Sequence, residues 1–169
     1  MALKGKTDVL KKVKRQSAGI LLYRHHQVSI QVLLVHYGGP FWKDKDLGSW
    51  SIPKGEYAEP ETPLQAAVRE FAEETGTTLS APFIELTPIV QKAGKGVHAW
   101  AKEGDLDADN IVCNTFTMEW PPKSGIWQTY PEVDKAAWYT LEQAREKINE
   151  AQIAFLNELQ AKLQASDLQ

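Results

Sequence analysis

The sequence lacks the features on which several classes of protein depend. It has a single cysteine, Cys113, so it can form neither an internal disulfide nor a cysteine-rich zinc site. No apolar run approaches the ~20 residues that a membrane-spanning helix needs, and the N-terminus has no apolar stretch of the kind that secretory signals carry. We therefore expect a cytoplasmic protein without disulfides and without a membrane partner.

Excess positive charge is also missing. The 19 Lys and Arg residues are outnumbered by 22 Asp and Glu residues, which gives a formal net charge of −3. Without a basic field over the whole chain, a nucleic-acid partner is not expected. Basic residues gather only at the start, so we interpret residues 1–16 as a solvated basic N-terminal arm. The remaining residues, 17–169, have the length of one domain, which could act as a monomer or as a homodimer.

Short apolar runs separated by polar and glycine-containing breaks predict strands in most of this domain. Two stretches have the pattern of helices. One covers residues 62–75, with Thr62 suited to the N-cap, Pro63 to the first helical position and Gly76 to the C-terminal stop. The other continues from Thr140, a second suitable cap, towards the C-terminus. This order predicts an α+β fold, an α/β/α sandwich in which helices flank a mixed sheet. The expected strands span residues 17–24, 29–37, 50–52, 83–90, 97–102, 111–120 and 136–139.

The helix over residues 62–75 carries a cluster of acidic side chains. Glu70, Glu73 and Glu74 share one patch of it, at the i, i+3, i+4 spacing. Like charges at this spacing destabilise a helix by roughly a few tenths of a kcal/mol per pair. A divalent cation removes the repulsion, and Mg²⁺ prefers hard oxygen ligands that it shares with phosphates and water. The patch therefore predicts a Mg²⁺ site, in which Mn²⁺ could substitute. A separate stripe faces the core, formed by Leu64, Ala67, Val68 and Phe71.

Residues around this helix suit the same task. Gly55 would let the backbone approach a metal closely and offer a carbonyl oxygen. Lys54 is a mobile cation that suits a phosphate oxygen. Glu61 can meet the positive end of the helix. Arg69 can hold a neighbouring glutamate through a fork of hydrogen bonds, so we include it among the expected catalytic residues.

Gly55, Glu61 and the run REFAEETG at residues 69–76 resemble the Nudix box, the signature of the Nudix hydrolases. Every fixed polar and glycine position of that signature is filled. One position departs from it, because Thr77 stands where the box normally has an aliphatic residue. That position packs rather than reacts, so the departure concerns local packing more than activity.

The resemblance implies a Nudix fold and a reaction, the hydrolysis of a phosphoanhydride bond by a metal-activated water. It also implies that Glu70, Glu73 and Glu74 are metal ligands, with Glu73 as the principal one and Gly55 adding its carbonyl. A general base must be a carboxylate near the metal-bound water. In this sequence the resemblance offers two residues for that role, Glu70 in the helix and Glu132 in a later loop.

Several side chains are expected to bind the substrate. A nucleobase needs a flat partner, and stacking contributes ~1–3 kcal/mol. Trp42, Trp127 and Tyr130 lie in expected loops and could provide it. Lys54 and Lys92 are the basic counterparts, and Lys92 sits in an expected turn from which it could reach the distal phosphates of a long polyphosphate.

The runs WSIPKG at residues 50–55 and QKAGK at residues 91–95 are similar to those of bacterial relatives of diadenosine polyphosphate hydrolases. We therefore favour a Mg²⁺-dependent pyrophosphohydrolase that acts on a dinucleoside polyphosphate or a nucleoside triphosphate. Three alternatives stay open: sanitation of oxidised deoxynucleoside triphosphates, removal of pyrophosphate from RNA 5′ ends, and a catalytically silent domain that binds a nucleotide. The basic arm is the only support for the RNA alternative. The intact carboxylate set counts against the silent one.

Overall fold

The computed structural model describes residues 15–168. Residues 1–14 of the predicted arm therefore lie outside the described residues. Of the rest of the arm, Arg15 lies 3.5 Å from Glu56, and Gln16 already begins the first strand. No helix among residues 15–168 is long and apolar enough to cross a membrane.

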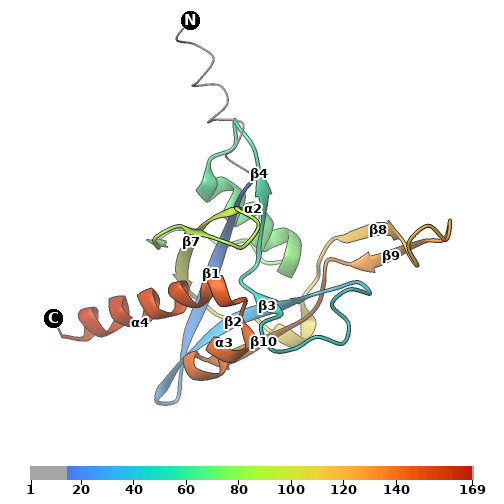
Figure 1. Cartoon of the computed structure of the whole chain (residues 1–169). Helices are drawn as coiled ribbons and strands as arrows, with labels where there is room; N and C mark the ends of the chain where they lie inside the picture. The colour runs from blue at the N-terminus through green and yellow to red at the C-terminus, as the bar shows by residue number, and fades with distance from the viewer. Residues whose placement is uncertain (1–14, 169) are drawn as a thin grey trace, which may run out of the picture.

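The elements of the central domain follow the predicted order of strands, helix, strands and helices (Figure 1). The helices are α2 (Pro63–Thr75), α3 (Leu141–Lys147) and α4 (Ile153–Asp167). The strands of the main sheet are β1 (Gln16–His26), β2 (Ser29–Tyr37), β3 (Trp50–Ser51), β4 (Lys54–Tyr57), β5 (Ile84–Glu85), β6 (Ile89–Val90), β7 (Gly96–Glu103) and β10 (Val133–Thr140).

The sheet is mixed. Its strands follow the order β10-β2-β1-β7-β5, in which β1 and β7 run parallel and the other neighbouring pairs run antiparallel. Three short strands extend it, since β3 pairs with β2, β4 with β1, and β6 with β7. The central strand β1 thus holds both β7 and the short strand β4, which precedes α2.

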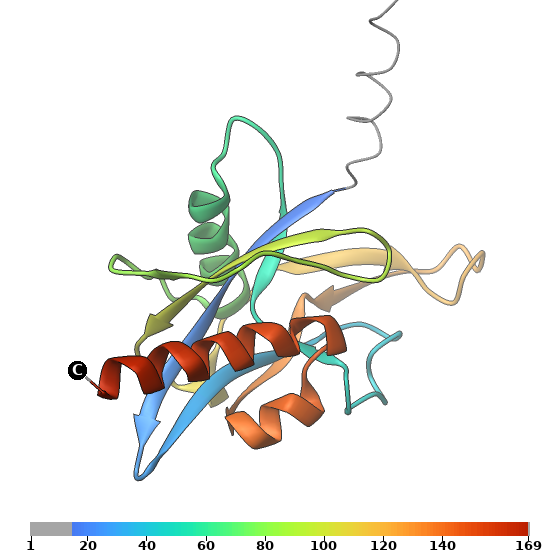
Figure 2. The same cartoon turned by 60° about the vertical axis from the view of Figure 1, so that its left-hand side comes forward.

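Helices cover both faces of this sheet, as the two views in Figures 1 and 2 show. Successive side chains of a strand point to opposite faces, and β1 is buried on both. Ile20 and Leu22 share an apolar cluster with Phe71 of α2, whereas Leu21 shares one with Phe155 of α4. The predicted α/β/α sandwich is therefore confirmed.

The ends of α2 are as predicted. Thr62 caps the helix, because its hydroxyl oxygen accepts a hydrogen bond from the Gln65 N–H at 3.2 Å. Gln65 returns a second bond, accepting from the Thr62 N–H at 3.0 Å. Gly76 ends the helix with a φ of 82°, a left-handed conformation that favours glycine.

The continuity predicted for the last helix is wrong. Thr140 caps α3, but the chain leaves the helix at Ile148, which has an extended backbone with φ −74° and ψ 151°. The N–H of Asn149 then donates to the carbonyl of Trp50 at 2.7 Å, which ties the break to β3. A short 3₁₀ turn, Glu150–Gln152, leads into α4.

The strand predicted over residues 83–90 is divided into β5 and β6. Thr87 lies between them and turns towards α4, where its N–H and hydroxyl donate to the Glu158 carboxylate at 2.7 and 2.9 Å. Pro88 follows and has no N–H for a strand ladder. The apolar pattern of residues 83–90 therefore does not indicate one continuous strand. The bonds from Thr87 to Glu158 of α4 divide its pairing with β7 into two short parts.

The strand predicted over residues 111–120 is too long, and a strand after it was missed. Only β8 (Thr115–Glu119) is extended and paired, and its partner is β9 (Trp127–Pro131), a segment expected to be a loop. The two strands form a separate two-stranded sheet that projects from the sandwich (Figure 1).

Candidate active site

The acidic patch of α2 faces the backbone of β4. Antiparallel pairing with β1 fixes that backbone, with Gly55 opposite Ala18 and Lys54 opposite Gly19. The approach of the two strands is close at this point, since a Cβ on Gly19 would lie 2.5 Å from the carbonyl oxygen of Pro53. The strand pairing therefore holds Lys54 and Gly55 in one position in front of the helix.

Gly55 is in direct contact with Glu70. A Cβ placed on Gly55 would lie 2.0 Å from the Glu70 Cδ and 2.1 and 2.3 Å from its carboxylate oxygens. Any side chain at position 55 would displace this carboxylate, so the close approach depends on glycine. The structure thus brings the predicted carbonyl ligand and the first predicted carboxylate ligand side by side.

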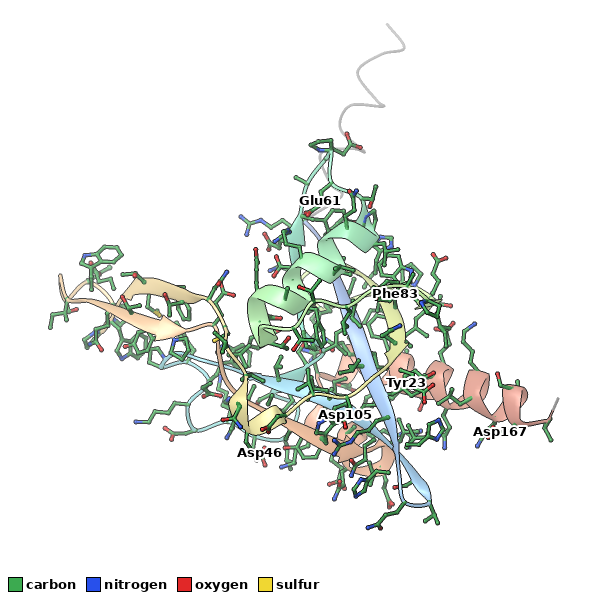
Figure 3. The ribbon with its side chains drawn as sticks, turned by 180° about the vertical axis from the view of Figure 1, so that it is seen from behind. Tyr23, Asp46, Glu61, Phe83, Asp105 and Asp167 are labelled. Carbon is green, nitrogen blue, oxygen red and sulfur yellow. The ribbon has the colours of Figure 1, made fainter. Side chains whose placement is uncertain are left out.

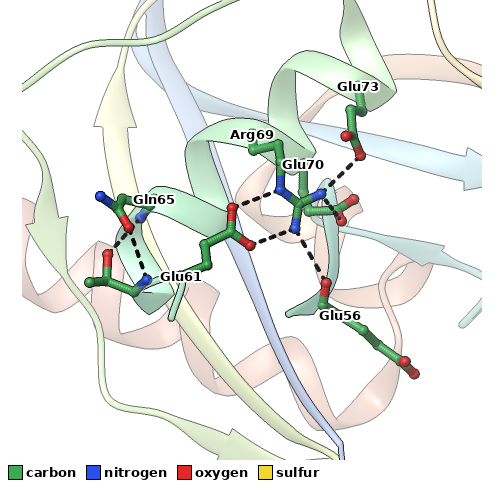
Figure 4. A network of polar contacts seen from close by, with 7 residues as sticks. Glu56, Glu61, Gln65, Arg69, Glu70 and Glu73 are labelled. Carbon is green, nitrogen blue, oxygen red and sulfur yellow. Dashed lines mark hydrogen bonds and ion pairs between the residues drawn. The ribbon is translucent and has the colours of Figure 1, made fainter. Parts of the chain in front are cut away.

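Arg69 connects three of the acidic residues (Figure 4). Its guanidinium donates to both carboxylate oxygens of Glu61 at 2.8 Å. One terminal nitrogen, Nη1, also donates to Glu70 at 2.7 Å and to Glu73 at 3.2 Å. These bonds raise the pKa of Arg69 and lower the pKa of Glu61. Glu61 lies at the start of α2 (Figure 3), so Arg69 spans the first two turns of the helix and orients the patch.

Glu74 is a buried carboxylate, with 3% of its surface exposed. Its Oε2 accepts a hydrogen bond from the Lys54 N–H at 2.8 Å. Burial raises the pKa of Glu74 well above its ordinary value, and Glu70 adds to the rise while Lys54 opposes it. Burial also lowers the pKa of Lys54. A buried acidic group of this kind is costly for the fold, and perturbed carboxylates of this kind are typical of functional sites.

Glu132 lies near the same helix although it comes much later in the sequence, between β9 and β10. Asn114 provides the link, because its N–H donates to the Glu73 carbonyl at 2.9 Å and its carbonyl accepts from the Glu132 N–H at 2.9 Å. Burial raises the pKa of Glu132, and the negative charge of Glu73 adds to the rise. The predicted base from the later loop is therefore placed within electrostatic reach of the patch.

The donor set fits a divalent cation in its chemistry. Burial raises the pKa of Glu70, and the charges of Glu73 and Glu132 raise it further against the effect of Arg69. A bound cation would relieve this repulsion. Within residues 15–168 no three His, Cys, Asp or Glu side chains are already gathered as a metal site, and Glu73 is bound to Arg69. Glu70 is bound to it as well, so metal binding would require both carboxylates to exchange contacts with Arg69, of 2.7 and 3.2 Å, for the cation.

A cavity of ≈ 390 Å³ opens in front of these groups. Trp42, which the sequence analysis expects to bind the substrate, lines it. Tyr37, at the end of β2, and Phe116, in β8, line it too and were missed by the sequence reasoning. The sequence predicts Tyr37 as the last residue of a strand. No local pattern distinguishes a strand end that borders a cleft from one that does not. Its other lining residues are Gly38, Lys54, Gly55, Glu56, Glu70, Glu74 and Glu132.

The remaining predicted substrate-binding residues lie elsewhere. Tyr130 and Trp127 are in β9 rather than in loops. Tyr130 packs behind the cavity, with its ring 5.9 Å from that of Phe116, and Trp127 is 66% exposed on the projecting hairpin. Lys92 does not line this cavity. A second cavity lies between Trp42 and Asn149, and Lys92 lines a third one beyond it.

Larger cavities exist away from the acidic patch. One of ≈ 710 Å³ lies between the β1–β2 turn and the helices α3 and α4, and one of ≈ 630 Å³ lies beside Arg24 and Trp138. Neither combines a close backbone approach with clustered, buried carboxylates. Size alone therefore does not locate the reactive site here.

Comparison with known proteins decides the family. The family model described as the NUDIX domain matches residues 13–159. The chain belongs to the Nudix family. As a Nudix domain it is a hydrolase that acts on phosphoric anhydrides. A search of the curated proteins gives no match.

Solved structures share this Nudix fold at low sequence identity. A C. elegans Ap4A hydrolase, in a binary complex, is 23% identical over 88% of this chain and 98% of its own, with a TM-score of 0.65. The NUDIX domain of Shewanella oneidensis NrtR, complexed with ADP ribose, is 17% identical over 88% and 87%, with a TM-score of 0.60. A mutT/nudix family protein from Listeria innocua is 16% identical over 92% and 97%, with a TM-score of 0.61.

Proposed function

We propose that this Nudix domain is a Mg²⁺-dependent pyrophosphohydrolase whose substrate is a dinucleoside polyphosphate or a nucleoside triphosphate. The observation that carries the proposal is the contact between Gly55 and the Glu70 carboxylate, beside the buried carboxylate of Glu74. A fold gains nothing from burying like charges at one point. The same carboxylates would, however, provide a binding site for a cation that also binds phosphate oxygens.

In this proposal Glu70, Glu73 and Glu74 hold the metal together with the carbonyl of Gly55. The bound metal would neutralise phosphate charge and activate the attacking water. Glu132 would serve as the carboxylate that takes up a proton from the attacking water, since it is near the patch and burial raises its pKa. Arg69 acts through its neighbours by fixing Glu61 and Glu70, and so it positions rather than reacts.

The shape of the site favours a long substrate. The cavity at Glu70 and the next one share Tyr37, Trp42 and Lys54. That second cavity shares Gly48, Gln91 and Asn149 with a third, which Lys92 lines. A chain of phosphates starting at the acidic patch would therefore pass Lys54 and lead towards Lys92. This arrangement favours a dinucleoside polyphosphate over a short nucleotide.

The similarity to an Ap4A hydrolase structure is compatible with this choice, although at 23% identity it speaks for the fold alone. The oxidised-nucleotide and RNA alternatives have no separate feature in their favour among residues 15–168. The decisive experiment is product analysis after incubation with diadenosine tetraphosphate, ATP and ADP-ribose, each with Mg²⁺ and with EDTA.

We expect Mg²⁺-dependent cleavage with diadenosine tetraphosphate as the best substrate, and loss of cleavage in Glu70→Gln. Asp44→Asn is the matched control. It replaces an acidic side chain with its amide in an exposed loop and should leave turnover unchanged. Tight nucleotide binding without turnover of any of the three compounds would instead favour the silent domain.

A further inference from the structure

A buried histidine lies next to the cleft, and the acidic patch does not involve it. His36 is in β2, directly before the cleft residue Tyr37, and its side chain is fully buried. Its Nδ1 lies 2.8 Å from the Asp134 Oδ1, and its Nε2 lies 2.7 Å from the carbonyl oxygen of Lys45. Both ring nitrogens therefore face oxygen atoms.

These two partners fix the protons. A carbonyl oxygen can only accept, so Nε2 must carry a hydrogen. An ionised carboxylate can also only accept, so Nδ1 must carry one too, which makes His36 an imidazolium paired with Asp134. The Asp134 side chain is 32% exposed. If the shared proton is removed, the lone pair of Nδ1 faces a carboxylate and the pair is repulsive.

The Lys45 carbonyl belongs to the loop that forms one wall of the cleft, residues 38–49. Trp42, in the middle of this loop, packs against Tyr37 with ring centroids 5.8 Å apart. The Lys45 ammonium lies 5.0 Å from the centre of the Trp42 ring. The end of the loop is held separately, because Asp46 bonds the Trp50 indole N–H at 2.9 Å and the Gly48 N–H donates to the Glu146 carbonyl at 3.1 Å. His36 thus ties the backbone of this loop to β2 through the carbonyl of Lys45.

We propose that the His36–Asp134 pair is a positioning device that fixes the residue 38–49 loop through the Lys45 carbonyl and thereby holds the Trp42 wall of the cleft. The part of this inference that concerns substrate rests on the proposed function. In the doubly protonated state the imidazolium donates to the loop and to Asp134 at once.

Other charged groups surround the pair, and none of them replaces it. On β10, Lys135 is the strand partner of His36, and its ammonium lies 5.5 Å from the Trp50 ring. On the loop, Lys45 and Asp46 contact Trp42 and Trp50. From α3, Lys147 pairs with Asp46. Asp134 is the carboxylate that contacts the His36 ring, at 2.8 Å.

Two substitutions test the proton on His36 Nδ1 separately from the bond between His36 and the Lys45 carbonyl. In Asp134→Asn the side-chain amide can donate to an unprotonated Nδ1, so neutral His36 keeps both bonds and no longer needs the extra proton. In His36→Asn the side-chain amide is too short to reach the Lys45 carbonyl, so the loop loses its attachment while a bond to Asp134 remains possible. Asp44→Asn removes an exposed loop charge and serves as the control.

The first test is the ¹⁵N–¹H NMR spectrum of the histidine rings. We expect wild-type His36 to show two slowly exchanging ring N–H protons and imidazolium ¹⁵N shifts at neutral pH, and Asp134→Asn to show one. A neutral single tautomer in the wild type at pH 6 would overturn the inference.

The second test is hydrogen exchange of the residue 38–49 loop, measured by mass spectrometry and corrected for intrinsic rates. At pH 7 the loop should be about tenfold less protected in His36→Asn than in the wild type, because the bond to the Lys45 carbonyl is lost. Asp134→Asn and Asp44→Asn should keep the protection of the wild type. Equal protection in the wild type and His36→Asn would refute the attachment of the loop through His36.

The third test is steady-state kinetics with diadenosine tetraphosphate. His36→Asn should raise KM about tenfold, as expected for the loss of one stacking contact, with kcat little changed. A fall in kcat at constant KM would contradict a role in positioning the cleft wall. If the wild type cleaves no nucleotide, the proposed function fails, whereas the NMR and exchange results still decide the inference about His36.

Discussion

The contact between Gly55 and Glu70 makes Gly55→Ala the most informative substitution. A methyl group at position 55 would lie 2.0 Å from the Glu70 Cδ, and ordinary contact begins at 3.4 Å. The carboxylate must therefore retreat by more than an ångström. Glu70 also accepts a hydrogen bond from the Arg69 guanidinium at 2.7 Å, so this displacement would disturb that bond.

The effect on activity can be estimated from that displacement. Misplacement of a catalytic group by ~1 Å can lower the rate about 100-fold, which corresponds to about 2.7 kcal/mol in the activation free energy. We therefore expect kcat/KM of Gly55→Ala to fall about 100-fold or more. The assay is the Mg²⁺-dependent release of products from diadenosine tetraphosphate, followed by chromatography.

The effect on stability should be small. Gly55 is not among the glycines with positive φ, so alanine fits the backbone and gains about 0.4–1 kcal/mol by restricting the unfolded chain. Against this stands the weakened bond to Arg69, which is partly exposed and contributes about 1 kcal/mol at most. The Tm should move by no more than about 4 °C.

Gly104→Ala is the matched control, because its new Cβ would meet only the Cδ1 of Leu22, at 3.1 Å, far along the sheet. It should retain full activity. Near-normal kcat/KM in Gly55→Ala, together with a normal Tm, would refute the argument that the Gly55–Glu70 approach is the reactive centre.

Three further outcomes follow from the packing and charges. Glu74→Gln should keep the bond to the Lys54 N–H but remove a buried charge. Denaturant unfolding should therefore show equal or higher stability at pH 7.5, while turnover falls at least 100-fold. Lower stability would contradict the burial argument. Phe71→Ala should lower the free energy of unfolding by about 3–5 kcal/mol, because Phe71 is fully buried under the sheet, and a loss below 1 kcal/mol would contradict the assignment of this core. Mg²⁺ should raise the Tm more at pH 8 than at pH 5.5, and an equal rise at both would argue against carboxylate ligands.

The sign of the pH effect follows from the raised pKa values. Burial raises the pKa of both Glu70 and Glu74 above their ordinary values. Without metal, the native state therefore holds protons more tightly than the unfolded chain, so these groups favour folding at low pH, and that contribution is lost as pH rises through the raised pKa values. Mg²⁺ requires the ionised carboxylates. Its stabilising effect is therefore largest at high pH, where the carboxylates without metal repel one another most.

The sequence was sufficient for those features that depend on local chemistry. The capped helix α2 was predicted closely because Thr62, Pro63 and Gly76 each act through their own backbone. The clustering of Glu70, Glu73 and Glu74 followed from helical spacing. The contact of Gly55 with this patch was implied by the family resemblance, and the pairing of β4 with β1 produces it.

Features that depend on contacts between distant segments could not be predicted. Apolar spacing after Thr140 gave no sign that the Asn149 backbone would bond to Trp50 and break the helix. Tyr130 was expected in a loop, yet pairing with β8 makes it part of a strand. Phe116 and Tyr37 reach the cleft only through the tertiary fold.

The same limit applies to His36. Its place in an apolar run predicts a buried strand position but not the partners at both ring nitrogens. Asp134 is almost a hundred positions away, and only the pairing of β2 with β10 brings it to 2.8 Å. Polar residues inside strands are therefore the positions at which the structure adds most to the sequence.

The central claim is that the carboxylates facing Gly55 bind a divalent cation. Isothermal titration of Mn²⁺ into the protein, with a non-hydrolysable ATP analogue present, tests it most directly. We predict saturable uptake by the wild type and its loss in the Glu70→Gln, Glu74→Gln double variant, with the fold retained. No uptake by the wild type, or equal uptake by both proteins, would contradict the claim.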